Sequence, residues 1–217
     1  MTSGPNGQRR TQAERRAESE DKLLRAALRL IAAQGFVSTT LAQVGEEAGY
    51  SRGLVTQRFG SKIGLAHAII GLIRQRFDED VVPRMADVPD RSAMHVWVDR
   101  YIEALEADSA THRAVIALQA EGMTSLTELR ADLADLNELW LEYLVGRLEA
   151  AQDQGEVAPG VDLRGTATAI LGLLRGTASQ FLIDPERVDL RAAGEAAKVM
   201  LSAALFENVA SYGTQDT

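Results

Sequence analysis

The chain has 217 residues, of which 46% are hydrophobic and 25% charged, and its formal net charge is -8 at pH 7. This composition is typical of a folded protein with a substantial core, and it excludes disordered and fibrous classes. The absence of cysteine excludes disulfides, thiolate metal sites and cysteine nucleophiles. Since no apolar run reaches the length of a membrane span and no apolar stretch follows the N-terminal arginines, we expect a cytoplasmic protein without membrane association.

The charge is unevenly distributed along the chain. Residues 1–62 contain ten Lys or Arg against six Asp or Glu, which gives +4, whereas residues 63–217 carry -12. A basic N-terminal part on an acidic protein indicates a polyanionic partner for that part alone.

Helical periodicity dominates the sequence, and we expect an all-α fold of about nine helices. Strand patterns of alternating β-branched and polar residues are nearly absent. Four of the five prolines separate long segments with helical spacing. The expected helices cover about 20–34, 41–48, 52–59, 62–80, 91–107, 110–121, 125–153, 162–182 and 186–210.

The first helices are short and have clear ends. Leu24, Leu28 and Ile31 make one apolar face of the helix at 20–34, and Gly35 ends it. Thr40 and Gln43 match a capping box, so the next helix starts at residue 41.

A tight turn at Gly49 and a cap at Ser51 lead to the helix at 52–59. Its Val55 and Phe59 are predicted to face the core, with Arg52, Gly53, Thr56 and Gln57 on the opposite face. Two short helices joined by such a turn are typical of a helix-turn-helix. We therefore predict a flexible tail at 1–19, a DNA-binding module at 20–64 and a larger helical domain at 65–217.

Residues 26–70 resemble the N-terminal DNA-binding region of the tetracycline-repressor (TetR) family. The matching features are Gly35–Phe36, Thr39–Thr40, Ala48–Gly49, Ser51–Arg52–Gly53, Phe59 and Ser61–Lys62. The resemblance implies that 52–59 is the recognition helix in the major groove, that Thr40 and Lys62 contact phosphate, and that the larger domain binds a ligand and forms a homodimer.

The chemistry of the 52–59 segment agrees with a role in DNA contact. Arginine pairs with guanine or phosphate and glutamine with adenine, while glycine permits close approach. The alternative is a solvated helix face. Thr56 stands where the family usually has tyrosine, and Leu54 where it often has threonine. The candidate DNA-binding residues are Thr40, Ser51, Arg52, Gly53, Leu54, Thr56, Gln57, Arg58 and Lys62.

The N-terminal arginines form either an arm that follows the DNA backbone or part of a solubilising tail. They are Arg9, Arg10, Arg15 and Arg16, and acidic residues are interleaved with them. This interleaving favours the tail.

Aromatic and polar residues of the larger domain are candidates for a ligand cavity, which suggests an apolar or amphipathic effector. Plain core packing is the alternative for each of them, because aromatic pairs at helical spacing usually pack in a core. The candidates are Trp97, Tyr101, His112, Gln119, Met123, Trp140 and Tyr143.

The last two helices are predicted to pair with those of a second subunit in a four-helix interface. Gly165, Ala169, Gly172 and Gly176 form a small-residue stripe there, and Arg175 is a charge in an apolar run that pairs either with an acidic group or with a ligand carboxylate. The candidate interface residues are Leu171, Leu174, Ala178, Leu182, Ala197, Met200, Leu201 and Leu205.

Enzyme motifs are absent, so we expect no catalytic residue, no metal site and no cofactor. The predicted function is a ligand-responsive transcription regulator, most simply a repressor that binds a palindromic site on double-stranded DNA as a homodimer and is released by a small molecule. Two alternatives remain: a helical binding protein whose DNA module is vestigial, and a regulator of the same fold without a small-molecule ligand.

Overall fold

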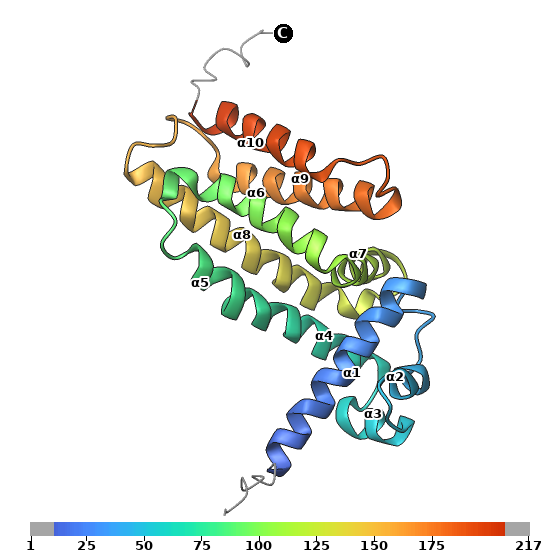
Figure 1. The fold of residues 1–217 in the computed structure, drawn as a ribbon. Helices are drawn as coiled ribbons and strands as arrows, with labels where there is room; N and C mark the ends of the chain where they lie inside the picture. The colour runs from blue at the N-terminus through green and yellow to red at the C-terminus, as the bar shows by residue number, and fades with distance from the viewer. Residues whose placement is uncertain (1–10, 207–217) are drawn as a thin grey trace, which may run out of the picture.

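The computed structural model describes residues 11–206, which form helices and no strand (Figure 1). This confirms the all-α prediction. Residues 11–206 contain nine α-helices of seven or more residues and one short α-helix, α5, between α4 and α6. The helices are α1 (Gln12–Gln34), α2 (Leu41–Glu47), α3 (Arg52–Phe59), α4 (Lys62–Arg76), α5 (Val82–Met85), α6 (Asp90–Ala107), α7 (Ser109–Thr124), α8 (Arg130–Asp153), α9 (Leu163–Ile183) and α10 (Leu190–Phe206).

Helix α1 begins earlier than the expected residue 20. The side chain of Thr11 accepts a hydrogen bond from the backbone N–H of Glu14, and the Glu14 carboxylate accepts one from the backbone of Thr11. This capping box starts the helix at Gln12, so residues 12–19 of the predicted tail are helical. Arg9 and Arg10 lie outside the described residues.

The expected helix at 62–80 is divided. Helix α4 ends at Arg76, a π-helical turn, η1 (Phe77–Val81), follows, and Pro83 lies in the first turn of α5. Proline is favoured in a first helical turn because it has no N–H to donate. The helix expected at 125–153 begins at Arg130, because a 3₁₀ turn, η2 (Thr127–Leu129), occupies the start of that range, and the helix expected from 186 begins at Leu190. Its predicted residues 207–210 lie outside the described part.

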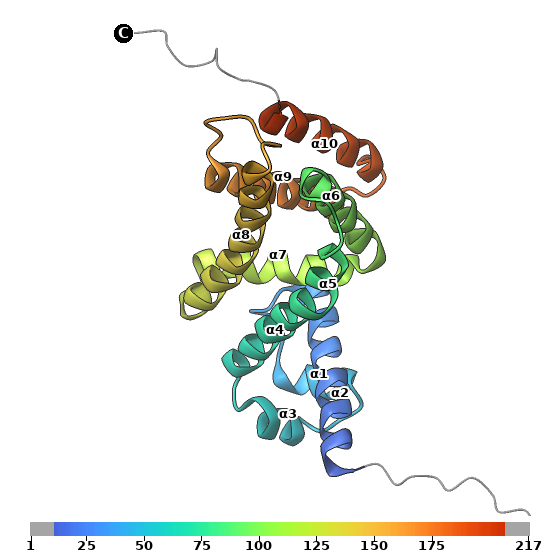
Figure 2. The same ribbon diagram turned by 90° about the vertical axis from the view of Figure 1, so that its left-hand side faces the viewer.

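Helices α1, α2 and α3 lie together at one end of the molecule, with the N-terminal end of α1 close to α3 (Figures 1 and 2). Leu23, Ile31, Phe36, Val44 and Val55 are fully buried between them. The buried set continues into α4 and α7 through Leu65, Ile69, Ala114 and Leu118.

Helices α6, α8, α9 and α10 form a second bundle around a separate apolar core. Its fully buried members include Met85, Leu105, Leu144, Leu174 and Ala178. Helices α9 and α10 lie side by side at the far end from α3 (Figure 1).

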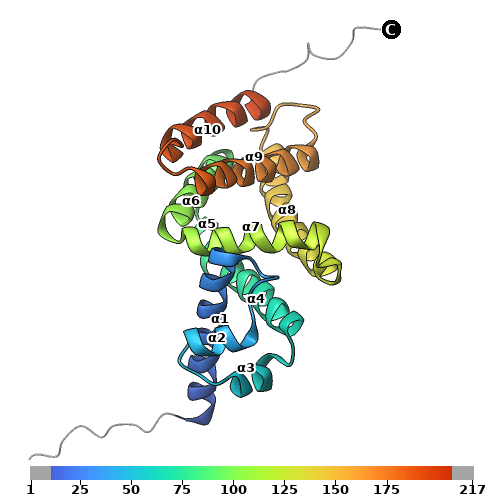
Figure 3. The ribbon, with the colours of Figure 1, turned by 90° about the vertical axis from the view of Figure 1, so that its right-hand side faces the viewer.

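Helix α7 crosses the molecule between the two cores (Figure 3). Its Ala114 and Leu118 belong to the first core, whereas Ile116 packs against the second. The division into 20–64 and 65–217 stays a prediction, and α4 and α7 are the elements through which the two ends meet. No helix in residues 11–206 has the length and hydropathy that crossing a bilayer requires.

Candidate DNA-binding surface and ligand cavity

Helix α3 has a buried side and an exposed side, as predicted. Val55 is fully buried and Phe59 is half-buried, whereas Arg52, Thr56 and Gln57 are exposed. The exposed face therefore presents guanidinium, hydroxyl and amide groups on one short helix, and these groups can donate hydrogen bonds to base edges and phosphates.

The turn before α3 fixes its orientation. Gly49 has a positive φ of 76°, which glycine adopts without strain, and the N–H of Tyr50 donates to the carbonyl of Gly45 over 2.7 Å. The side chain of Ser51 accepts a hydrogen bond from the N–H of Leu54 over 3.2 Å and caps the helix. Ser51 thus already has a structural partner, while Gly53 leaves the first turn of α3 open.

Arg58 does not share the outer face with Arg52. Its Nη2 donates to Oγ of Ser19 over 3.0 Å, its Nη1 lies 3.9 Å from a carboxylate oxygen of Glu20, and its side chain is only 11% exposed. Arg58 therefore joins α3 to α1, and these contacts indicate a structural role for its side chain.

Thr40 and Lys62 are both engaged within the protein. Thr40 caps α2 through the predicted box with Gln43. The Nζ of Lys62 donates to the carbonyl of Val37 over 2.6 Å and lies 4.9 Å from the centre of the Phe36 ring. Burial lowers the pKa of Lys62, and the nearby Glu121 carboxylate opposes that shift. A lysine ammonium has three donors, so two remain for a phosphate.

The start of α1 adds basic residues beside α3. A polar hollow separates the two helices, and the early start of α1 places two of the arginines that the sequence analysis assigned to a tail at its edge. The capping box Thr11–Glu14 is the sequence signal that locates them on a helix. The hollow is lined by Gln12, Arg15, Arg16, Ser19, Leu54, Gln57 and Arg58.

A cavity of about 490 Å³ lies in the larger helical part. This volume is within the range of roughly 300–1,000 Å³ found for small-molecule sites. Five predicted ligand residues line it: Trp97, Tyr101, His112, Gln119 and Trp140. The sequence analysis missed much of the remaining wall, which includes Ile73, Arg76, Phe77, Met85, Ile116 and Leu171.

Two predicted ligand residues lie elsewhere. Met123 is 70% exposed near the end of α7, because the helix continues past the cavity. The ring of Tyr143 packs edge-on against Phe77 with centroids 5.4 Å apart, and it lies 5.5 Å from Trp97. Tyr143 therefore supports the aromatic wall from behind without lining the cavity.

Arg175, which the sequence left ambiguous, lines the cavity. Its Nη1 donates to Oδ1 of Asn137 over 2.6 Å, and its guanidinium carbon lies 5.0 Å from the centre of the Trp140 ring. Burial lowers the pKa of Arg175, and its interaction with Tyr101 opposes the shift. Burial likewise raises the pKa of Tyr101 to about 12, so this phenol is neutral at physiological pH.

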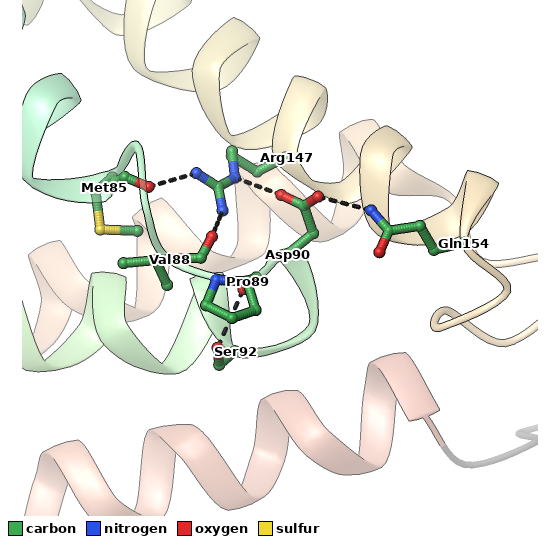
Figure 4. Close-up of polar contacts among 7 residues, drawn as sticks. All are labelled: Met85, Val88, Pro89, Asp90, Ser92, Arg147 and Gln154. Atoms are coloured by element: carbon green, nitrogen blue, oxygen red, sulfur yellow. Dashed lines mark hydrogen bonds and ion pairs between the residues drawn. The ribbon is translucent and has the colours of Figure 1, made fainter.

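The turn between α5 and α6, which adjoins the cavity wall at Met85, is held by one arginine of α8 (Figure 4). Arg147 donates to the carbonyls of Met85 and Val88, and its Nε lies 2.8 Å from a carboxylate oxygen of Asp90. Gln154 donates to the other oxygen of Asp90 over 2.9 Å. These contacts bind a turn to the neighbouring helix and indicate a structural role for Arg147.

Comparison with known proteins identifies the N-terminal helices. Residues 23–69 match the family described as "Bacterial regulatory proteins, tetR family". The HTH-type transcriptional repressor BepR of Brucella suis biovar 1 (strain 1330) is 26% identical over 188 residues, which cover 84% of this chain and 88% of that protein. Residues 23–69 thus form a TetR-family DNA-binding region.

Solved structures show the same fold over most of the chain. The transcriptional regulator FadR from Bacillus subtilis in complex with stearoyl-CoA has a TM-score of 0.75 at 20% identity and covers 85% of this chain and 98% of its own. AibR in complex with isovaleryl coenzyme A and operator DNA has a TM-score of 0.69 at 21% identity, with 87% and 98% covered. The family match at residues 23–69, the curated relatives and this fold together support a DNA-binding transcriptional regulator.

One carboxylate connects the cavity side of this TetR-family protein to its DNA-binding end. Glu121, on α7, accepts hydrogen bonds from the backbone N–H groups of Phe36 and Val37 over 3.1 and 3.0 Å. Lys62, at the start of α4, binds the carbonyl of Val37. The loop between α1 and α2 is therefore held from both α7 and α4.

Most of the predicted interface residues are buried within the single subunit, so they contribute to the core of their own chain. The leucines and alanines pack into the core of their own chain, and only Met200 is exposed, at 59%. The outer surface of α9 instead carries the small-residue stripe, where a side chain added at Gly172 or Gly176 would meet nothing within 4 Å. The residues that are buried are Leu171, Leu174, Ala178, Leu182, Ala197, Leu201 and Leu205.

Within residues 11–206, no three His, Asp or Glu side chains are grouped as a metal site would require.

Proposed function

We propose that this TetR-family regulator is a repressor that binds a palindromic operator as a homodimer in the cytoplasm and leaves the DNA when a small molecule fills the cavity. In the proposed complex each subunit inserts α3 into a major groove. The two half-sites are then one helical turn, about 34 Å, or a multiple of it apart. The relative BepR is a transcriptional repressor, which supports repression by this chain as well.

The observation that carries the proposal is the group of exposed donors on α3 at the basic end of an acidic chain. Arg52 and Gln57 are the proposed base-contacting residues, because both are exposed and neither forms a side-chain hydrogen bond or ion pair within residues 11–206. Thr56 is exposed beside them and is suited to a phosphate contact.

Arg15 and Arg16 extend the proposed DNA-binding surface. They lie on the exposed first turns of α1, beside the hollow that Gln57 also lines. Arginines in this position can neutralise phosphates next to the groove that α3 enters, since phosphate contacts position a protein without sequence readout. This replaces the tail as the favoured role for these two residues.

The proposed dimer uses the outer faces of α9 and α10. Val199 and Met200 are exposed at 70% and 59%, and Ile183 is also exposed. Apolar side chains next to an open stripe of small residues allow the helices of a second subunit to approach closely. Because the same patch serves both subunits, such an interface has the two-fold symmetry that a palindrome requires.

The cavity supports control by a small molecule. Helix α7 contributes Thr111, His112 and Ile116 to its wall and Glu121 to the contact with the α1–α2 loop. A ligand that shifts α7 therefore acts on the DNA-binding end directly, in addition to any effect through α4. FadR and AibR were each solved with a coenzyme A thioester bound, which supports an effector for this chain as well.

The test starts with selection of genomic DNA fragments by the purified protein. Fluorescence anisotropy of the best fragment at several salt concentrations should give a steep slope, and a palindrome should be common to the selected fragments. Arg52→Ala and Gln57→Ala should each weaken binding by about 1–3 kcal/mol if they contact bases. Replacing both Arg15 and Arg16 by glutamine should reduce the slope by up to about 0.9 for each lost phosphate contact.

Arg187→Ala is the matched control. Arg187 is exposed in the turn between α9 and α10, two helices at the far end of the molecule from α3 (Figure 1), and among the described residues its guanidinium pairs with Asp184, three residues earlier. This variant should bind the fragment like the wild type. Failure to select any fragment above non-specific affinity would favour the vestigial alternative, whereas selection of a site unaffected by Arg52→Ala and Gln57→Ala would remove α3 as the reading element.

A further inference from the structure

The cavity wall contains two buried donors that have no partner among the described residues. They are Nη2 of Arg175 and Nε1 of Trp97, which is only 7% exposed. Native proteins seldom leave buried donors unpaired, because each loses its hydrogen bonds to water without replacement. Both side chains line the same cavity, so a ligand with oxygen acceptors would supply what the protein does not.

Arg175 also lacks a counter-ion in the part of the chain that the structure describes. Its polar contact is the neutral amide of Asn137, and its charge acts on the phenol of Tyr101. A charged group in a poorly solvated site is stabilised by a paired opposite charge. A guanidinium with one free amino group is thus ready to receive an anion.

The walls near Arg175 are otherwise largely apolar. Phe77, Met85, Trp140, Ile116 and Leu171 contribute rings and aliphatic side chains. The other charged lining groups are mostly exposed, and one of them, Arg100, is paired with Glu103 over 2.8 Å. Around Trp97 and Trp140 the cavity therefore combines the buried guanidinium of Arg175 with a large apolar surface.

We infer that the effector is an amphipathic carboxylate, whose anionic head group pairs with Arg175 and whose apolar body packs between Phe77, Met85 and Trp140. Trp97 Nε1 provides a further donor for an oxygen of the ligand. A monoanion matches the buried guanidinium of Arg175, whose Nη2 has no partner among the described residues, whereas a phosphate dianion would keep uncompensated charge beside it. This inference rests on the proposed function, since it names the class of molecule that releases the DNA.

The two tryptophans of the chain provide the measurement. Trp97 and Trp140 both line the cavity, so their fluorescence reports its occupancy without a label. The probes are dodecanoate and 2-naphthoate, their neutral counterparts dodecanol and 2-naphthamide, and dodecanoyl-CoA, all below micellar concentrations. At least one carboxylate should bind about tenfold or more tightly than its neutral counterpart, as expected for a charge-assisted hydrogen bond in a buried site.

Arg175→Met should remove this preference. It keeps an unbranched side chain but deletes the charge, so carboxylate affinity should fall about tenfold or more while dodecanol affinity changes less than about threefold. Arg175→Lys should retain the preference for carboxylate, because it retains the charge. It also serves if the methionine variant does not fold, which circular dichroism would reveal.

Arg164→Met is the matched control. Arg164 lies on the same helix but is exposed and paired with Glu138 outside the cavity. Its removal should leave the binding of every probe unchanged. Trp97→Phe, followed by calorimetry, should weaken carboxylate binding less than Arg175→Met, since it removes only a neutral donor.

Three outcomes would overturn the inference: equal affinity for carboxylates and their neutral counterparts, binding of dodecanoyl-CoA alone, or no carboxylate binding at millimolar concentration. Anisotropy of the selected DNA fragment in the same samples tests ligand-controlled DNA binding separately from the chemical class of the ligand. Release of the DNA by a neutral compound would preserve the proposed function and reject the carboxylate. Carboxylate binding through Arg175 without any effect on bound DNA would support the carboxylate site and reject release of the DNA by this ligand.

Discussion

Two arginines of the same short helix have different surroundings, and these surroundings assign them different roles. Arg52 lies exposed at the start of α3, whereas Arg58, two turns later, is bonded to Ser19 of α1. The contact with Ser19 joins elements 39 positions apart in the sequence. The presence of an arginine on the recognition helix therefore does not tell whether its side chain contacts DNA or stabilises the DNA-binding module.

Replacing each of these arginines by alanine separates the two roles. Arg58→Ala should lower the free energy of unfolding by about 1–3 kcal/mol, because it leaves a buried contact unmade. Arg52→Ala should change it by less than about 0.5 kcal/mol, as is usual for an exposed residue. Urea denaturation followed by circular dichroism measures both. An Arg58→Ala protein as stable as the wild type would return Arg58 to the candidate DNA contacts.

At the scale of helices, the sequence predicted where most helices begin and end, but less often which neighbour covers each helix face. The bounds of α3 and the capping of α2 and α3 follow from local signals such as Ser51 and the Thr40–Gln43 pair. The early start of α1 was missed because residues 12–18 have no apolar stripe, although Thr11 and Glu14 carried the capping signal. For α9, an apolar stripe such as Leu171 and Leu174 does not tell whether the core or another subunit covers it, since both burials favour the same residues.

The outer face of α10 gives a direct test of the proposed dimer. Met200→Glu places a charge on the exposed patch and should convert the dimer to a monomer, because an unpaired charge is costly to bury in an apolar interface. Met123→Glu is the matched control, since Met123 is equally a methionine exposed on a helix but lies on α7. Light scattering after gel filtration reads the mass. A Met200→Glu dimer of unchanged stability would place the interface elsewhere.

At the scale of the whole molecule, the sequence could not show that the two ends share their packing. Ala114 and Leu118 of α7 are buried against α1 and its neighbours, while residues of the same helix line the cavity in the other half. This contact joins segments more than 80 residues apart, and Glu121 adds hydrogen bonds to Phe36 and Val37 across it. Helix α7 is therefore a second connection between the two ends, beside α4.

Glu121→Ala tests this connection. The backbone N–H groups of Phe36 and Val37 would lose their acceptor, so the free energy of unfolding should fall by about 1–3 kcal/mol. The coupling should also weaken: where an effector lowers wild-type affinity for DNA by roughly 5–150-fold, it should lower that of the variant by a smaller factor. Anisotropy with and without saturating effector gives both factors.

Glu128→Ala is the control for this prediction, because Glu128 is an exposed acidic residue of the neighbouring turn η2. The Glu128→Ala protein should have the wild-type free energy of unfolding, and the effector should lower its affinity for DNA by the same factor as in the wild type. Linkage requires DNA to weaken effector binding by the same factor in each protein, so a titration of effector with the operator present checks every value independently. If Glu121→Ala loses stability but keeps the full factor, α7 serves only as a support and the signal passes through α4.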